Sequence, residues 1–489
     1  MAFAVDSRRI GFALLAVAAS AGLIWFGTGL FPLWPLLWFA PLPVLMVASR
    51  GSWWATALTA ALAWIIGNLN REHYFSAALH VPLTGRVEIL VAPAIVFTIA
   101  VLLYRALLRR GAYCSALVAF PAAWVSFEYI FNLTSPHGTA ISLSYSELSF
   151  LPVLQLASIT GPWGISFLVL SFSSALAIGV HLRSTAPKQA VRIVSATLGV
   201  VALVLVFGAV RLALPAPPGQ EVRVGLIASD LPENSDVAAP GADTDRLLRD
   251  YAAHAETLAA QGAKVIVLPE HLGTIVCPNT ANADEIFQSL ANKTGSTIVV
   301  GIGHLSPQIN YNQARVYAPS VQVMSYNKEH LLPPFESIFT PGSTVVTISE
   351  RTAKLGVAIC KDMDFTGLSR RYGNAGTGLL LVPAWDFVLD RFSHGHIAVM
   401  RGVEDGFGIV RAARDGYLTV SDNRGRILAE TESNSAPFAT LIADVPAVHD
   451  TTVYLRFGNW FAWLTIGLLA FTLARLMMLR RPAHPTTRR

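Results

Sequence analysis

The stretch Lys264-Val-Ile-Val-Leu-Pro-Glu270 is a short apolar run that ends on a carboxylate. Two later runs have the same form: Val-Met-Ser-Tyr-Asn precedes Lys328, and Leu-Gly-Val-Ala-Ile precedes Cys360. Short apolar runs bounded by turn residues are typical of buried strands. We therefore expect a carboxylate, an ammonium and a thiol at three strand ends, and these groups are the parts of an acyl-transfer site.

The chemistry of these three groups predicts a ping-pong reaction. The thiolate is the nucleophile, and a free cysteine has a pKa of about 8.5. Lys328 would stabilise a thiolate on Cys360 and then an oxyanion, while Glu270 would take the thiol proton and return it to the leaving group. A buried cysteine is more often a core residue, and a Glu–Lys pair is more often a surface ion pair. The shared strand-end placement favours the catalytic interpretation.

The remainder of the second half alternates strand-like and helix-like segments. The predicted strands are 222–228, 264–269, 297–302, 314–319, 321–327, 354–360, 378–383, 417–421 and 438–444, and the predicted helices are 243–261, 283–293, 368–374 and 391–413. Strands that alternate with helices predict a layered α/β domain.

The composition of the whole chain is that of a membrane protein. Of its 489 residues, 53% are hydrophobic and 14% are charged, whereas soluble proteins carry about 25% charged residues. A spanning helix needs roughly 20 mostly apolar residues. About eight spans are predicted, at 10–28, 32–49, 52–70, 88–108, 112–133, 162–182, 193–213 and 458–478. Segment 134–161, which is rich in Ser, Gly and Pro, is expected to form a re-entrant or lid-like loop.

Charge divides the chain into three predicted parts: a membrane domain at 1–213 with about seven helices, a polar domain at 214–457, and a last helix with a basic tail at 458–489. Residues 216–455 contain 18 Lys and Arg against 26 Asp and Glu. Lys and Arg elsewhere gather at span ends, and such residues favour the cytoplasmic side. This pattern predicts an extracytoplasmic polar domain, and its acidic balance argues against a nucleic-acid partner.

Longer motifs around the three residues resemble those of the nitrilase, or carbon–nitrogen hydrolase, superfamily. Leu-Pro-Glu at 268–270, Tyr-Asn-Lys-Glu-His-Leu-Leu-Pro-Pro-Phe-Glu at 326–336 and Ile-Cys-Lys-Asp at 359–362 carry this resemblance. Seven predicted spans, this domain and an eighth span are similar to one branch of it, the apolipoprotein N-acyltransferases. Residues 121–128 and 155–168 resemble two membrane-side motifs of that branch.

The resemblance implies an αββα sandwich with Glu270, Lys328 and Cys360 as the triad and Glu336 as a supporting carboxylate. It implies that a phospholipid acyl chain passes to Cys360 as a thioester, and then to the amino group of a diacylglyceryl-cysteine that begins a lipoprotein. The implied partners are the phospholipid donor, the apolipoprotein acceptor and the bacterial inner membrane. No cofactor is expected, and the protein is expected to be a monomer.

Lys361 and Asp362 depart from the family pattern, which has an aromatic residue and a glutamate after the nucleophile. We expect Lys361, as an additional cation, to lower the pKa of the Cys360 thiol. Asp362 is expected to orient the site with a shorter reach than glutamate would have.

The substrate side is predicted from a second departure. The family's Ser-Asn-Asp-Ala-Trp-Phe-Gly segment appears as Val-Pro-Ala-Trp-Asp-Phe at 382–387, so Trp385, Asp386 and Phe387 are candidates for contact with substrate. Glu128 is a further candidate because it lies in a predicted span, and carboxylates inside a membrane are costly and often functional. A structural carboxylate paired with a neighbouring helix is an equal alternative for Glu128.

Other signals are weak. His394 and His396 lack a third ligand at helical or strand spacing, so no metal site is predicted. Cys114, Cys277 and Cys360 have no paired spacing and predict no disulfide framework. Two alternative functions stay open: a membrane-anchored amidase or acyltransferase of the same fold that acts on a different amine or amide, and a degenerate domain that serves as an envelope scaffold.

Overall fold

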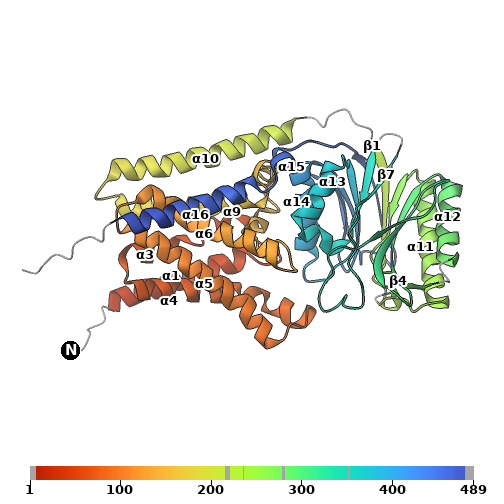
Figure 1. The fold of residues 1–489 in the computed structure, drawn as a ribbon, viewed down its shortest axis with the longest axis horizontal. Coiled ribbons are helices and arrows are strands. Elements are labelled where there is room, and N and C mark those ends of the chain that lie inside the picture. The colour runs from red at the N-terminus through yellow and green to blue at the C-terminus, as the bar shows by residue number, and fades with distance from the viewer. Residues whose placement is uncertain (1–6, 215–220, 235, 278–280, 351–352, 480–489) are drawn as a thin grey trace, which may run out of the picture.

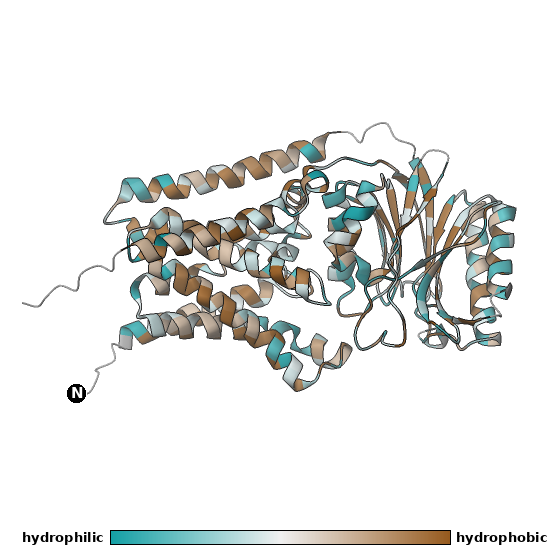
Figure 2. Ribbon diagram, in the orientation of Figure 1, coloured by the Kyte–Doolittle hydropathy of each residue, from teal (hydrophilic) through white to brown (hydrophobic). Residues whose placement is uncertain are grey.

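The computed structural model describes residues 7–214, 221–234, 236–277, 281–350 and 353–479. A bundle of mostly apolar helices lies at one end and a pair of β-sheets flanked by helices lies at the other (Figure 1). The hydropathy colouring follows the same division, because apolar residues dominate the bundle whereas the outer helices of the sheet region carry many polar ones (Figure 2).

Six helices in the described residues are long and apolar enough to cross a membrane. They are α1 (Ser7–Gly27), α5 (Leu83–Leu108), α6 (Tyr113–Thr134), α9 (Pro162–Leu182), α10 (Pro187–Ala213) and α16 (Trp460–Met478). The bundle is confirmed, and six helices of the described residues meet this measure against about eight predicted.

The difference comes from two predicted spans in the first seventy residues. Segment 32–49 is divided into α2 (Trp34–Leu37) and α3 (Leu42–Arg50), and a proline stands in the first turn of each piece. Proline has no backbone N–H and its ring clashes with the preceding turn, so it is tolerated at a helix start but interrupts a continuous helix. Segment 52–70 forms α4 (Trp53–Asn68), whose 16 residues are short for a full crossing.

Segment 134–161 forms short helical turns between the bundle and the sheets. These turns are η3 (Leu143–Glu147), α7 (Leu151–Leu154) and α8 (Ala157–Thr160). Trp460 Nε1 in α16 donates to the backbone oxygen of Ile159 at 2.8 Å, and Gln155 Nε2 donates to the backbone oxygen of Arg424 at 2.9 Å. The segment therefore joins the two halves of the molecule.

The sheet region has the predicted αββα arrangement. One sheet has the order β13-β1-β2-β4-β5-β6, with β3 paired to β4, and the other has the order β12-β11-β10-β9-β8-β7. The first-sheet strands are β1 (Glu221–Ala228), β2 (Val265–Val267), β3 (Thr274–Val276), β4 (Thr297–Leu305), β5 (Tyr311–Tyr317), β6 (Met324–Asn327) and β13 (Ala439–Pro446). The second-sheet strands are β7 (Val346–Ser349), β8 (Lys354–Val357), β9 (Leu379–Trp385), β10 (Gly408–Arg414), β11 (Tyr417–Ser421) and β12 (Ile427–Glu432).

Helices cover the outer face of each sheet. α11 (Ala242–Ala260) and α12 (Ala281–Thr294) cover the first sheet, while α13 (Thr366–Asn374) and α14 (Arg391–Asp405) cover the second and face the bundle (Figure 1). Between the two sheets lies an apolar core that includes Val267, Tyr326 and Leu381, and Cys360 belongs to it.

Helix α14 packs on the second sheet on one face and on the helical bundle on the other. Ala398 belongs to the apolar cluster beneath the second sheet, whereas Ile397, Met400 and Val403 belong to the large cluster formed by the bundle helices. A helix that is apolar on two faces is buried on both. The short helix α15 (Val453–Phe457) then leads from the last strand into α16.

A substitution at Gly161 tests the packing of segment 134–161 against helix α15. Its φ is +64°, and an added Cβ would lie 2.4 Å from the ring of Tyr454 in α15. We expect Gly161→Ala to cost roughly 1–3 kcal/mol of stability through backbone strain, in addition to the steric contact. The thermal unfolding midpoint of the detergent-solubilised protein should fall. Gly199→Ala in α10, where an added Cβ meets nothing within 4 Å, is the control, and an equal effect of the two variants would contradict this packing.

Candidate active site

Two of the three predicted catalytic residues, Glu270 and Cys360, are hydrogen-bonded to the end of strand β9. Glu270 follows β2 and its backbone N–H donates to the carbonyl of Ala384 at 3.2 Å. Cys360 follows β8, and its Sγ–H donates to the next carbonyl of β9, that of Trp385, at 3.3 Å. Cys360 has a φ of +41°, a conformation that non-glycine residues rarely adopt and that is concentrated at functional sites.

Lys328 follows β6 and lies between two carboxylates. Its Nζ is 2.7 Å from Glu270 Oε1 and 2.8 Å from Glu336 Oε2. Asn312 donates through Nδ2 to Glu270 Oε1 at 2.7 Å and also to Glu336, and the backbone N–H of Leu332 donates to Glu336 Oε2 at 2.6 Å. Lys328 and Glu270 are each 3% exposed. Because water hardly reaches them, these partners stabilise their charges.

Glu270, Lys328 and Cys360 shift one another's pKa values. Burial raises the pKa of Glu270, and Lys328 only partly opposes that shift. Burial would lower the pKa of Lys328, but Glu270 and Glu336 together raise it well above its usual value. Burial followed by the charge of Glu270 raises the pKa of the Cys360 thiol well above its usual range, against the opposing effect of Lys328. These shifts favour a neutral thiol on Cys360 and a charged ammonium on Lys328, and they make Glu270 a stronger base than an exposed carboxylate.

Lys361 pairs with a carboxylate, and its expected effect on the thiol stays a prediction. Its Nζ lies 3.3 Å from Asp364 Oδ2 and over the ring of Phe365, and the pKa of the Cys360 thiol is raised, not lowered. The positive charge of Lys361, which we expected to stabilise a thiolate on Cys360, is paired with Asp364.

Asp362 fixes the backbone before Cys360 to the neighbouring strand and loop. It is fully buried, and it accepts hydrogen bonds from the backbone of Ile359 at 3.0 Å, the backbone of His330 at 2.9 Å and the hydroxyl of Tyr326 at 2.7 Å. These bonds join the turn at Cys360 to β6 and to the loop after Lys328. The loop at 137–140 adds a tie from the bundle side, since Thr139 N donates to the carbonyl of Asp364 at 3.0 Å.

Of the predicted substrate-side residues, Trp385 and Asp386 adjoin the thiol. The Trp385 ring lies beneath the guanidinium of Arg414, 3.4 Å from it, and its Nε1 donates to Asp415 at 2.9 Å. Phe387 is partly exposed and its ring centroid is 5.6 Å from that of Phe335, in the loop that carries Glu336.

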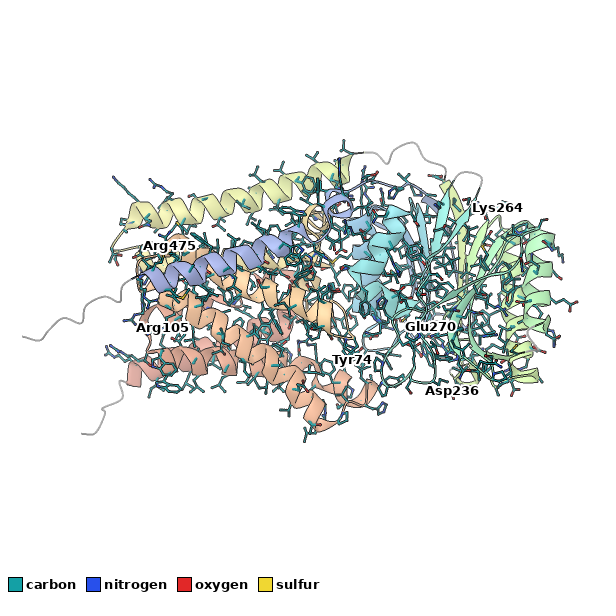
Figure 3. The ribbon with its side chains drawn as sticks, viewed as in Figure 1. Tyr74, Arg105, Asp236, Lys264, Glu270 and Arg475 are labelled. Carbon is teal, nitrogen blue, oxygen red and sulfur yellow. The ribbon has the colours of Figure 1, made fainter. Side chains whose placement is uncertain are left out.

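Asp386 points inward to a second set of charges. Both of its carboxylate oxygens accept hydrogen bonds from Arg411, and His394 Nδ1 is 3.1 Å from Oδ1. His394 also lies near Asp364 and Asp390, and Tyr74 of the bundle donates its hydroxyl to Asp390 Oδ2 at 2.6 Å. Figure 3 shows Tyr74 at the end of the bundle that faces Glu270.

One group of side chains in the described residues has the spacing of a metal site. Cys360 Sγ, an oxygen of Asp386 and a nitrogen of His394 lie within 4.8 Å of one another, and all three are zinc ligand types. Asp386, however, is bidentate to Arg411, and both nitrogens of His394 face carboxylates. A nitrogen that donates to a carboxylate has no lone pair for a metal, so this arrangement fits a protonated imidazole.

Glu128 lies apart from these groups, in α6. It accepts hydrogen bonds from Trp124 Nε1 at 2.8 Å, from the backbone of Leu143 at 2.6 Å and from Ser166 Oγ at 3.1 Å. These contacts hold the start of η3 against α6 and α9. They correspond to the structural alternative considered for this carboxylate.

Three residues of the site were missed from the sequence, Asn312, Arg411 and Asp390, and His394 was considered only as a metal ligand. Asn312 and Arg411 each interrupt an otherwise buried strand with a polar group, and such a group needs a buried partner. The sequence did not reveal this requirement, because Asn312 precedes the predicted strand 314–319 and Arg411 falls within the predicted helix 391–413, whereas the structure has strands at 311–317 and 408–414. The partners themselves come from distant parts of the chain and are set by the packing of the two sheets.

Two family models match the chain, one in each half. Residues 20–175 match the apolipoprotein N-acyltransferase N-terminal domain, and residues 237–448 match the carbon–nitrogen hydrolase family. The two matches occur in the same order as the bundle and the sandwich.

Relatives match across both halves. Apolipoprotein N-acyltransferase of Geobacter metallireducens is 27% identical over 415 residues, which cover 77% of this chain and 78% of that one. The protein of the same name from Haemophilus ducreyi is 24% identical over 516 residues, which cover 96% and 93%. Among solved structures, an amidase from Nesterenkonia is similar to 52% of this chain with a TM-score of 0.42 and 21% identity. The two family models, with the relatives that match across both halves, show that the chain belongs to the apolipoprotein N-acyltransferase family, the membrane branch of the carbon–nitrogen hydrolases.

Proposed function

We propose that this protein transfers an acyl chain from a phospholipid, through a thioester on Cys360, to the amino group of a diacylglyceryl-cysteine at the start of a lipoprotein. The observation that carries the proposal is the buried Lys328–Glu270 ion pair, whose charges act on the thiol of Cys360. The sandwich that holds this pair is packed on a helical membrane bundle through α14. This combination fits an acyl-enzyme whose substrates are lipids.

In the first half-reaction the S–H bond of Cys360 breaks and its proton passes to Glu270. The sulfur attacks the ester carbonyl carbon of the phospholipid, and Lys328 stabilises the oxyanion that forms. The bond between the carbonyl carbon and the ester oxygen then breaks, and Glu270 returns the proton to that oxygen. A lysophospholipid leaves and the acyl chain stays on Cys360. The raised pKa of Glu270 suits a group that must both take and return a proton.

In the second half-reaction the α-amine of the acceptor attacks the thioester carbon. Glu270 takes a proton from the attacking nitrogen, the C–S bond breaks, and the sulfur leaves as a thiolate that recovers the proton. The products are an amide and the free Cys360 thiol. Each half-reaction passes through charge on sulfur, so stabilisation of that charge affects both.

Apolar side chains near the site suit a lipid donor. Phe335, Ile338 and Val388 are respectively 46%, 62% and 57% exposed, and they lie in the loops after Lys328 and after Asp386. Tyr74 and Phe387 approach to 6.2 Å between ring centroids, which joins the bundle to these loops. Exposed apolar side chains that face a bilayer gain free energy by leaving water.

We infer that the sandwich faces the extracytoplasmic side. Arg105 and Arg475 lie at the end of the bundle that is distant from the sheets (Figure 3). Basic residues favour the cytoplasmic ends of spanning helices. The opposite end, which carries Tyr74 and adjoins Glu270, then lies at the outer surface.

Cys360 should carry the acyl chain. Incubation of the purified protein with phospholipid vesicles should add the mass of one acyl chain to the peptide containing Cys360, and hydroxylamine should remove it. Cys360→Ala should lose the adduct, whereas Cys277→Ala should retain it because Cys277 is exposed and outside the site. An adduct on Cys277, or none on the folded parent protein, would refute the thioester mechanism.

Glu270 should set the acidic limb of the pH profile. Its carboxylate is the base, so thioester formation should fall about tenfold per pH unit below its raised pKa. Asn312→Leu removes a hydrogen bond to the charged carboxylate, which contributes about 1.5 kcal/mol, and should move the limb upward by about one pH unit. Gln313→Leu is the matched control, since Gln313 bonds to Asn327. The assignment fails if the limb stays in place in Asn312→Leu.

Reporter fusions should test the orientation. Alkaline phosphatase needs disulfides, which form outside the cytoplasm. A fusion after Leu214, before the sandwich, should be active, and a fusion after Thr185, between α9 and α10, should be inactive. The reverse pattern would place the sandwich in the cytoplasm.

A further inference from the structure

His394 is a partly buried histidine that the triad chemistry does not use. One of its ring nitrogens lies within 4.8 Å of Cys360 Sγ. Its Nδ1 is 3.1 Å from Asp386 Oδ1 and 3.8 Å from Asp390 Oδ2, and its Nε2 is 3.6 Å from Asp364 Oδ2. Nδ1 is thus placed to donate to Asp386, and Nε2 lies at ion-pair distance from Asp364, an arrangement that favours the protonated ring.

The groups around His394 balance its charge. Three carboxylates face it, and each has another partner: Asp364 pairs with Lys361, Asp386 with Arg411, and Asp390 accepts from the hydroxyl of Tyr74. The carboxylates supply three negative charges, and Lys361 and Arg411 supply two positive ones. A protonated His394 makes the group neutral. Asp364 and Asp390 accordingly raise the pKa of His394 to about 10 although burial opposes the shift.

The thiol needs such a cation. Lys328 is shared between Glu270 and Glu336, so two carboxylates already offset its single charge. Glu270 and Asp386 both raise the pKa of Cys360, while Lys328 and Arg411 lower it. With a neutral imidazole, the cluster on the Asp386 side would carry a net negative charge beside the sulfur and would oppose thiolate formation.

We propose that His394 is a positioning residue that holds a fixed imidazolium beside Cys360 and stabilises negative charge on its sulfur. It transfers no proton, because the thiol proton passes to Glu270. Lys361 contributes indirectly: it pairs with Asp364, which in turn faces His394. This inference deepens the proposed function, since both half-reactions place charge on sulfur.

The test measures the thiol itself. In a background of Cys114→Ser and Cys277→Ser, the rate of iodoacetamide alkylation of Cys360 is followed against pH in the intact protein. An opposite charge within about 4–6 Å lowers a pKa by roughly 1–3 units. His394→Gln should therefore slow alkylation at pH 8 by at least about tenfold and move the profile to higher pH. His394→Lys, which restores a positive charge, should recover part of the rate.

His396→Gln is the matched control on the same helix. The Nδ1 of His396 is paired with the backbone oxygen of Phe392 at 2.8 Å, and the variant should keep the parent profile. An unchanged profile in His394→Gln, or an equal loss in His394→Gln and His394→Lys with the parent thermal midpoint retained, would overturn the proposal. Loss of the parent profile with a chelator and its recovery with zinc would also overturn it and would indicate a metal site.

Alkylation and acyl transfer give separate answers. A shifted alkylation profile in a protein that forms no thioester with phospholipid would support the charge assignment and refute the acyltransferase function. A normal thioester yield with an unshifted alkylation profile would support the acyltransferase function and refute the charge assignment to His394.

Discussion

The buried ammonium of Lys328, shared between Glu270 and Glu336, is the interaction on which the site depends. Removing one partner from a buried ion pair typically costs about 3–5 kcal/mol, because the other charge is left without compensation. Asn312, which bonds to both carboxylates, and the backbone of Leu332 complete the cluster. Its members come from separate loops and strands, so the pair can form only when the first sheet and the loop after β6 are correctly packed. Burial and the charge of Glu270 raise the pKa of the Cys360 thiol, and Lys328 opposes that shift.

Strand β9 and helix α14 connect this cluster to the membrane. Consecutive carbonyls at the end of β9, those of Ala384 and Trp385, accept from Glu270 and Cys360. The chain then passes through Asp386 and Asp390 into α14, which packs on the bundle helices. One continuous segment of about twenty residues, from Ala384 to Val403, therefore bonds to Glu270 and Cys360 at its start and packs on the bundle at its end.

The sequence was sufficient for the sandwich, the bundle and the positions of the three reactive groups, because strand ends and apolar runs are local signals. It was insufficient where the outcome depended on distant partners. Lys361 was assigned to the thiol from its adjacency to Cys360, but Asp364 lies one turn further on and competes for its charge. His394 was dismissed as a metal ligand because its neighbours in space, Asp386 and Cys360, do not stand at ligand spacing in the chain. Segment 32–49 was predicted as one span because only Pro32 and Pro35 were taken as an interruption, whereas Pro41 and Pro43 divide the segment again.

The identity of the acyl acceptor is the central claim, and a chase experiment tests it most directly. The acyl-thioester is formed on Cys360, excess phospholipid is removed, and a synthetic peptide with an N-terminal diacylglyceryl-cysteine is added. Mass spectrometry should show a peptide acylated on its α-amine and an equal amount of free Cys360, whereas the same peptide with a blocked α-amine should leave the thioester intact. Release of fatty acid to water at the same rate with either peptide would contradict the account and would indicate a hydrolase.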